Sequence, residues 1–140
     1  MYPDLMVVPM REELTRVGIA EARTPEEVDR AVAQPGTLMI VVNSICGCAA
    51  GKMRPAVRHA LHGAVRPERM ISVFAGQDRE ATERARTYFS GWEPSSPSIA
   101  LLRDGKLVFF MPRHHIETRD VVDITDDLQD AFTRFCAPVV

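Results

Sequence analysis

The chain has 140 residues, with 17 lysines and arginines against 19 aspartates and glutamates. This length suits one domain spanning residues 1–140, since domains commonly hold about 100–150 residues. A formal charge of −2 excludes the clustered basic excess of a nucleic-acid-binding protein, and no apolar run approaches the ~20 residues that cross a membrane.

The first part of the chain is predicted to contain two helices and two strands. Apolar spacing over residues 10–17 predicts a short amphipathic helix, and residues 21–23 suggest a brief edge strand. Thr24 can cap a second helix, whose first position is a proline, and Glu27 completes a capping box that reaches back to the cap amide. The continuous apolar run 37–42 predicts a strand buried on both faces, as in a parallel sheet covered by helices.

The middle of the chain repeats the alternation of helix and strand. A helix is expected over residues 49–62, with a kink at Pro55 because proline removes one backbone hydrogen bond. Residues 70–75 form a second buried strand. Asp78 is the expected N-cap of the following helix, which runs to about Phe89.

The last part of the chain is predicted to be a hairpin and a helix. The dipeptide Asp104-Gly105 is a strong hairpin signal between strands 98–103 and 106–111. A final helix runs from residue 118 or 120 to about residue 136. After the first helix the order is therefore β-α-β-α-β-α-β-β-α, which predicts an α/β thioredoxin-like fold. A central mixed sheet would be flanked by helices, with an extra N-terminal helix.

The three cysteines are the candidate reactive residues of the chain. An N-terminus without a basic and then an apolar region leads us to expect a cytoplasmic protein, where cysteines serve reactivity rather than stapling. Cys46 and Cys48 follow the central strand at the start of a helix, where positive partial charge and unpaired amides favour thiolate. We therefore hypothesise that the pKa of Cys46 lies below the usual ~8.5.

A disulfide between Cys46 and Cys48 requires a particular conformation of the turn. Within a regular helix Cys48 would lie about 200° around the axis from Cys46, so a disulfide requires Cys46 to stand outside the helix and Gly47 to bend. Such a small ring is strained and easily reduced, which favours a transient resolving role for Cys48.

Other interpretations of the cysteine pair remain open. The pair can be two small buried residues without reactivity. It can also be half of a tetrahedral metal or iron–sulfur site that Cys136 and histidines complete through folding, although no second Cys/His pair has finger-like spacing. A thioredoxin-like scaffold that has lost activity is a third possibility.

A series of short segments resembles the bacilliredoxin family of small thioredoxin-like proteins. The segments occur in the right order and together cover most of the chain: Val42-Asn43-Ser44-Ile45-Cys46-Gly47-Cys48-Ala49, Arg54-Pro55-Ala56, Val73-Phe74-Ala75-Gly76-Gln77-Asp78, Pro94-Ser95-Ser96-Pro97-Ser98, Asp104-Gly105-Lys106, Arg113-His114 and Ile116-Glu117. The sequence departs from the family where Thr118-Arg119 replaces an expected Gly-His, which puts any histidine role there in doubt.

The resemblance implies a reaction on protein–bacillithiol mixed disulfides. Cys46 would take the bacillithiol from a client protein, and either Cys48 or a second bacillithiol would then release it. General disulfide reduction or isomerisation of the thioredoxin type is a related possibility. The resemblance implies no bound metal or prosthetic group, only bacillithiol as co-substrate and bacillithiolated client proteins as partners. It leaves open whether the chain is a monomer or a homodimer.

The resemblance also implies a substrate-binding segment. Thioredoxin-like proteins place a cis-proline beside the active-site sulfur, and Pro97 precedes a strand in the corresponding position. The Ser96 backbone would then pair with an extended substrate, next to the small Gly47.

Other polar candidates have simpler expected roles. We expect Arg54 to face solvent, with attraction of the bacillithiol carboxylates as the alternative. We expect Cys136 to be a buried small hydrophobe, with an intermolecular disulfide or a second resolving thiol as the alternative. His114 and His115 should point to opposite sides of an extended segment, which argues against a shared metal. Solvated or partly buried helical positions are expected for His59 and His62, and core positions for Met39 and Met53.

Overall fold

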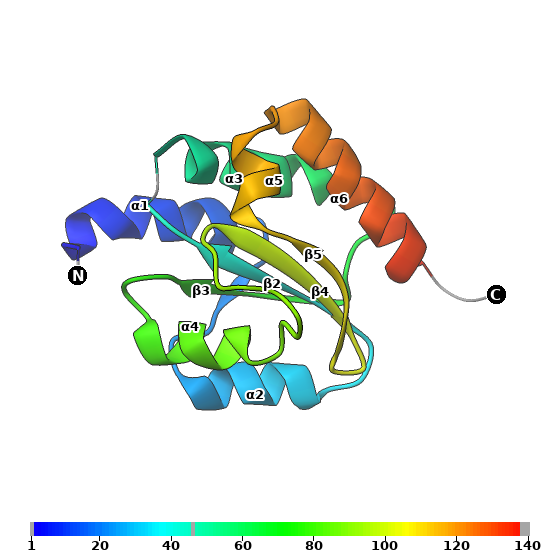
Figure 1. Cartoon of the computed structure of the whole chain (residues 1–140), viewed down its shortest axis with the longest axis horizontal. Helices are drawn as coiled ribbons and strands as arrows, with labels where there is room; N and C mark the ends of the chain where they lie inside the picture. Colours follow the sequence, from blue (N-terminus) through cyan, green and yellow to red (C-terminus); the bar gives the residue numbers. More distant parts are fainter. Residues whose placement is uncertain (1, 46, 138–140) are drawn as a thin grey trace.

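The computed structural model describes residues 2–45 and 47–137. Its elements follow one another along the chain as α1 (Asp4–Thr15), β1 (Ala20–Glu21), α2 (Pro25–Ala33), β2 (Thr37–Asn43), α3 (Gly47–Ala60), β3 (Arg69–Phe74), α4 (Arg79–Arg86), β4 (Ser98–Arg103), β5 (Lys106–Met111), α5 (Arg113–Glu117) and α6 (Val121–Phe135). Figure 1 shows the helices arranged around one sheet. No helix of the described residues is long and apolar enough to cross a membrane.

The five strands form one mixed sheet in the order β1-β3-β2-β4-β5. The central strand β2 pairs parallel with β3 and antiparallel with β4, and β1 pairs parallel with β3 at the edge. The sheet of mixed direction agrees with the sequence-based prediction. All seven residues of β2 are buried, as expected of a strand with helices on both faces.

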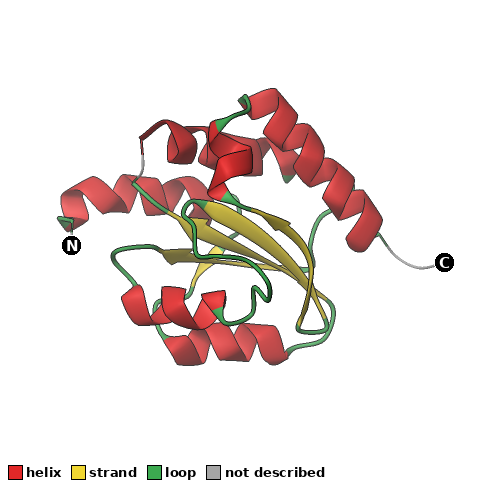
Figure 2. Cartoon of the chain, in the orientation of Figure 1, coloured by secondary structure: helices red, strands yellow, loops and turns green. Residues whose placement is uncertain are grey.

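Helices cover both faces of the sheet (Figure 2). On one face α2 and α4 pack over Leu38, Ile40 and Val42 of β2, while on the other α1, α3 and α6 pack over Met39 and Val41. This alternation follows from the two-residue period of side chains along a strand. Both apolar clusters therefore hold β2, and with it the segment that leads to the cysteines.

Short sequence motifs correctly predict the start of α2 and the turn between β4 and β5. The Thr24 hydroxyl accepts a hydrogen bond from the Glu27 amide at 3.2 Å and so caps α2. The Glu27 carboxylate accepts from the Arg23 amide rather than from the expected Thr24 amide. In the β4–β5 hairpin Asp104 and Gly105 have φ angles of 50° and 79°, the left-handed conformation that a type I′ turn requires.

Two helices differ most from the prediction, and α4 ends at Arg86 rather than near Phe89. The first begins at Asp4 rather than at residue 10, and includes Pro9. The short helix α5 was not predicted, and it follows Pro112, whose fixed φ suits the residue before a helix. The Lys52 ammonium on α3 donates to the Glu117 carbonyl at 3.0 Å, which ties α5 to the helix that begins with Gly47.

Candidate active site

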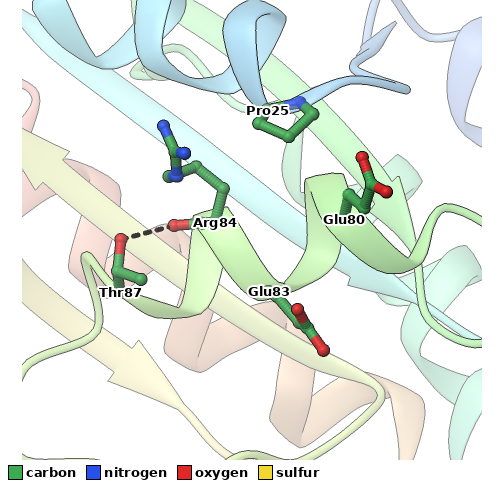
Figure 3. Close-up of a pocket in the computed structure, with 5 residues that line it drawn as sticks. All are labelled: Pro25, Glu80, Glu83, Arg84 and Thr87. Carbon is green, nitrogen blue, oxygen red and sulfur yellow. Dashed lines mark hydrogen bonds between the residues drawn. The ribbon is translucent and has the colours of Figure 1, made fainter.

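A hollow between α2 and α4 has no convergent chemistry. It measures about 370 Å³ and is lined by Pro25, Glu80, Glu83, Arg84 and Thr87. Figure 3 shows that the Glu83 carboxylate points to the other side of α4 from Pro25 and the Arg84 guanidinium. The candidate site must therefore be sought at the predicted cysteine turn.

The cysteine turn lies between the end of β2 at Asn43 and the start of α3 at Gly47. Cys46 itself lies outside the described residues. Cys48 is exposed in the first turn of α3, which begins two residues earlier than predicted. Apart from its chain neighbours and its own helix backbone, a Cβ added at Gly47 would meet no atom of the described residues within 4 Å, so there is open space beside Gly47.

The Arg54 guanidinium holds the backbone that enters the turn. Its Nη1 donates to the Ser44 carbonyl at 2.8 Å and to the Asn43 side-chain oxygen at 3.2 Å, and its Nε pairs with Glu13 of α1. Only 8% of Arg54 is exposed, so the expectation of a solvent-facing charge is wrong. Arg54 is buried because its acceptors on α1 and at the end of β2 are distant in sequence and come close only after folding.

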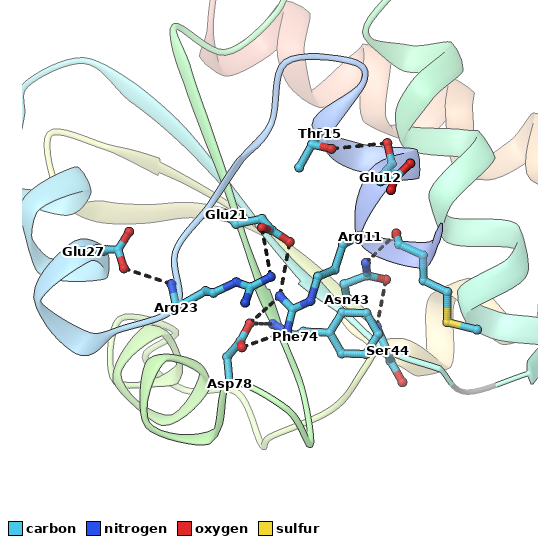
Figure 4. A network of polar contacts seen from close by, with 11 residues as sticks. Arg11, Glu12, Thr15, Glu21, Arg23, Glu27, Asn43, Ser44, Phe74 and Asp78 are labelled. Atoms are coloured by element: carbon cyan, nitrogen blue, oxygen red, sulfur yellow. Dashed lines mark hydrogen bonds and ion pairs between the residues drawn. The ribbon is translucent and has the colours of Figure 1, made fainter. Parts of the chain in front are cut away.

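Asn43 links the same backbone to α1. Its side-chain oxygen also accepts from the Ser44 amide at 2.9 Å, and its side-chain nitrogen donates to the Met10 carbonyl at 3.1 Å (Figure 4). Asn43 and Ser44 are 1% and 3% exposed. The segment before Cys46 is therefore fixed from three elements, β2, α1 and α3.

A second buried ion pair lies beside this segment. The Asp78 carboxylate accepts from both terminal nitrogens of Arg11 at 2.9 Å and from the Phe74 amide at 3.1 Å (Figure 4). These hydrogen bonds to Asp78 raise the pKa of Arg11, so the cation is held firmly. Asp78 is the residue before α4 as predicted, but its side chain caps no helix amide because it faces Arg11.

The proline segment lies at the same end of the sheet. The Ser96–Pro97 bond is cis, as expected from the resemblance. Because Ser98 pairs with Val42 across β4 and β2, Ser96 and Pro97 lie level with the end of β2. The Ser96 carbonyl accepts from the Arg113 guanidinium at 3.3 Å, so the unpredicted helix α5 helps to position this segment.

Cys136 lies at the opposite end of the sheet. It is half-buried at the end of α6, near Thr37, the first residue of β2. Thr37 is six residues from Asn43, which is about 20 Å along a strand. Burial raises the pKa of the Cys136 thiol. Cys136 therefore cannot reach the cysteine turn as a resolving thiol or as a metal ligand.

The histidines do not converge on the turn either. His59 and His62 are exposed, in agreement with the solvated expectation. His114 and His115 both lie on α5 with ring centroids 5.9 Å apart, so the expected extended segment with opposite faces is wrong. Among the residues described, no three His, Cys, Asp or Glu side chains are grouped as metal ligands. Met39 and Met53 are fully buried in the core as predicted.

Comparisons with known proteins agree with this arrangement. The family model described as disulphide isomerase matches residues 2–136. A bacilliredoxin of Koribacter versatilis is 60% identical over 137 residues, covering 97% of this chain and 94% of its own length. A bacilliredoxin of Staphylococcus aureus is 47% identical over 136 residues, with the same coverage of 97% and 94%.

Solved structures with the thioredoxin fold superpose on the chain. A variant thioredoxin of Halobacterium salinarum has a TM-score of 0.60 at 14% identity, covering 89% of this chain and 96% of its own. Mitochondrial thioredoxin 3 of Saccharomyces cerevisiae has a TM-score of 0.58 at 15% identity, covering 84% and 98%. These likenesses show the fold, and the predicted thioredoxin-like class is confirmed.

Proposed function

Because the chain belongs to the bacilliredoxin family and is a thiol–disulfide oxidoreductase, we propose that it removes bacillithiol from protein mixed disulfides through Cys46-Gly47-Cys48. Full-length similarity to two named bacilliredoxins carries this proposal. The exposed Cys48 thiol at the start of α3, next to an open Gly47, supports it.

In the first step the Cys46 thiolate attacks the bacillithiol sulfur of the client mixed disulfide. The disulfide bond to the client breaks, the client cysteine leaves as a thiolate and takes up a proton, and Cys46 carries the bacillithiol. Attack by a thiolate on a disulfide sulfur exchanges one disulfide for another, so no external electron acceptor is needed.

In the second step a thiolate removes bacillithiol from Cys46. Attack by Cys48 on the Cys46 sulfur forms the internal disulfide and releases reduced bacillithiol. Attack by a second bacillithiol instead releases bacillithiol disulfide and restores the Cys46 thiolate. The exposure of Cys48 is compatible with the internal route.

The surroundings of the turn favour a thiolate at its entrance. The first turn of α3 presents amides that have no partner within the helix, and the Arg54 cation is bonded to the Ser44 carbonyl, two residues before Cys46. The unpaired amides stabilise negative charge nearby and support the proposed lowered pKa of Cys46, whereas the Arg54 charge is already paired with Glu13 and serves to hold the backbone.

Mass spectrometry of single-cysteine variants tests the assignment of roles. After incubation with a bacillithiolated client, Cys48→Ala should gain the mass of one bacillithiol on Cys46, whereas Cys46→Ala should gain none. An adduct on Cys48 in the Cys46→Ala variant would reverse the roles, and no adduct on either variant would refute the proposed reaction.

General disulfide reduction is the second candidate, since the matching family model is described as a disulphide isomerase. Comparing exchange rates on a bacillithiolated client and on an intramolecular protein disulfide separates the two. De-bacillithiolation predicts the faster rate on the mixed disulfide, and general reduction predicts the faster rate on the protein disulfide.

A further inference from the structure

A second hollow lies on the face of α4 away from α2. It measures about 250 Å³, and its lining residues are Gly76, Arg79, Thr82, Glu83 and Arg86. We refer to these five residues as the α4 cavity. Its lining contains two arginines and one carboxylate, so the positive charges outnumber the negative ones.

Arg86 is a half-buried cation without an ion pair. Its Nε is buried and has no hydrogen-bond partner among the described residues, and one Nη makes a long bond of 3.4 Å to the Ser95 carbonyl. No carboxylate of the described chain lies within 4.0 Å of the guanidinium, although Glu83 acts on it at longer range. Burial lowers the pKa of Arg86, because the guanidinium has lost water and has no close carboxylate in the described part of the chain to offset that loss.

Thr82 adds an unpartnered hydroxyl on the same side of α4. The residue is 2% exposed, and its Oγ has no hydrogen-bond partner among the described residues. Thr82 and Arg86 are four residues apart, so their side chains lie one above the other on a helix. Buried polar groups are usually paired, and two unpaired ones at one cavity point to a ligand that accepts hydrogen bonds.

The α4 cavity is close to both parts of the candidate active site. Gly76 follows Ala75, whose amide donates to the Asn43 carbonyl at 3.0 Å, at the end of β2. Arg86 contacts Ser95, the residue before the cis Ser96–Pro97 bond. The cavity therefore lies at the same end of the sheet as the last residue of β2 and the cis-proline segment.

We propose that the α4 cavity is an anion subsite that binds a carboxylate of bacillithiol in the mixed disulfide. The inference rests on the proposed function. Arg86 supplies the charged donor, Thr82 the hydroxyl, and Arg79 a second cation at the rim. Bacillithiol carries carboxylate groups, whereas many protein disulfides present none next to the sulfur, so the subsite selects the capped client.

The test compares two substrates that differ in the cap. The same client protein is capped with bacillithiol or with the uncharged 2-mercaptoethanol, and kcat/KM is measured for the intact protein and for Arg86→Gln. The substitution should reduce kcat/KM about tenfold on the bacillithiol cap, the effect of losing roughly one charged hydrogen bond, and leave the other cap unchanged. Arg86→Lys should recover most of the loss.

The matched control is Arg84→Gln. Arg84 lies on the same helix but faces α2, where it pairs with Asp29, and its loss should affect both caps equally or not at all. An equal loss on both caps for Arg86→Gln would show that Arg86 only positions the Ser95 segment, and no loss would show that the subsite is empty. Either result overturns the proposal.

A binding measurement separates this proposal from the proposed function. Reduced bacillithiol is titrated into Cys46→Ala and into Cys46→Ala carrying Arg86→Gln, and about tenfold weaker binding is expected in the second protein. Binding that depends on Arg86, without transfer by the intact protein, would refute the reaction and leave the subsite. Transfer and binding that are both independent of Arg86 would refute the subsite and leave the reaction.

Discussion

Replacement of Arg54 by alanine tests whether the buried guanidinium holds the cysteine turn. The substitution removes two hydrogen bonds to the Ser44 carbonyl and the Asn43 side chain, together with the pair to Glu13. Removing one partner of a buried ion pair costs about 3–5 kcal/mol. The Glu13 side chain is 39% exposed and can regain water, so we expect a loss at the lower end, about 3 kcal/mol in the free energy of unfolding.

The same substitution should slow thiol exchange. The Ser44 carbonyl loses its charged donor two residues before Cys46, and displacement of a reacting group by about 1 Å can reduce rates up to a hundredfold. We expect the second-order rate on a bacillithiolated client to fall about tenfold. Arg54→Lys keeps the charge but not the forked geometry, so its exchange rate should lie between those of the intact protein and Arg54→Ala.

Urea unfolding followed by circular dichroism measures the loss in the free energy of unfolding. Stopped-flow kinetics measure the rate of thiol exchange. Arg58→Ala is the control, because Arg58 lies about one turn further along α3 and makes no side-chain hydrogen bond within the described part of the chain. Unchanged stability and unchanged exchange in Arg54→Ala, matching Arg58→Ala, would refute the positioning role.

Three further substitutions test the surrounding structure. Asp78→Asn should lower the free energy of unfolding by about 3 kcal/mol, because it breaks a pair in which the Arg11 and Asp78 side chains are only 11% and 8% exposed; a change below about 0.5 kcal/mol in urea would contradict this. Cys136 should react with iodoacetamide more slowly at pH 8 than a cysteine in an unfolded peptide, because its raised pKa leaves less thiolate at every pH below that value. Its rate should climb as the pH rises, and Cys136→Ser should leave exchange unchanged. Asp120→Ala should cost about 1 kcal/mol in thermal unfolding, since the Asp120 carboxylate caps α6 by accepting from the Asp123 amide at 2.9 Å; an unaltered melting temperature would argue against that cap.

The fold follows from signals that act over short stretches of sequence. The continuous apolar run 37–42 became the buried strand β2, and Asp104-Gly105 became the hairpin turn with two left-handed residues. The predicted cap at Thr24 is also present. Each depends on neighbouring residues alone, which is why the order of elements could be deduced without the structure.

Features that depend on distant partners could not be predicted in this way. The sequence predicts a solvent-facing Arg54, because its acceptors, Ser44 and Glu13, lie outside α3 and are brought to it only by folding. Asp78 was correctly placed at a helix start, but it faces Arg11, 67 residues away, instead of capping. The unpaired groups of Arg86 and Thr82 leave no pattern in the sequence, since only burial makes them unusual.

The most direct test of the central claim follows the client thiol. A bacillithiolated client is incubated with the intact protein, with Cys46→Ala or with Cys48→Ala, in the presence of excess reduced bacillithiol, and released client thiol is measured over time. We predict repeated turnover by the intact protein, none by Cys46→Ala, and turnover sustained by bacillithiol alone in Cys48→Ala. Release of client thiol by Cys46→Ala at the rate of the intact protein would contradict the assignment of Cys46 as the nucleophile.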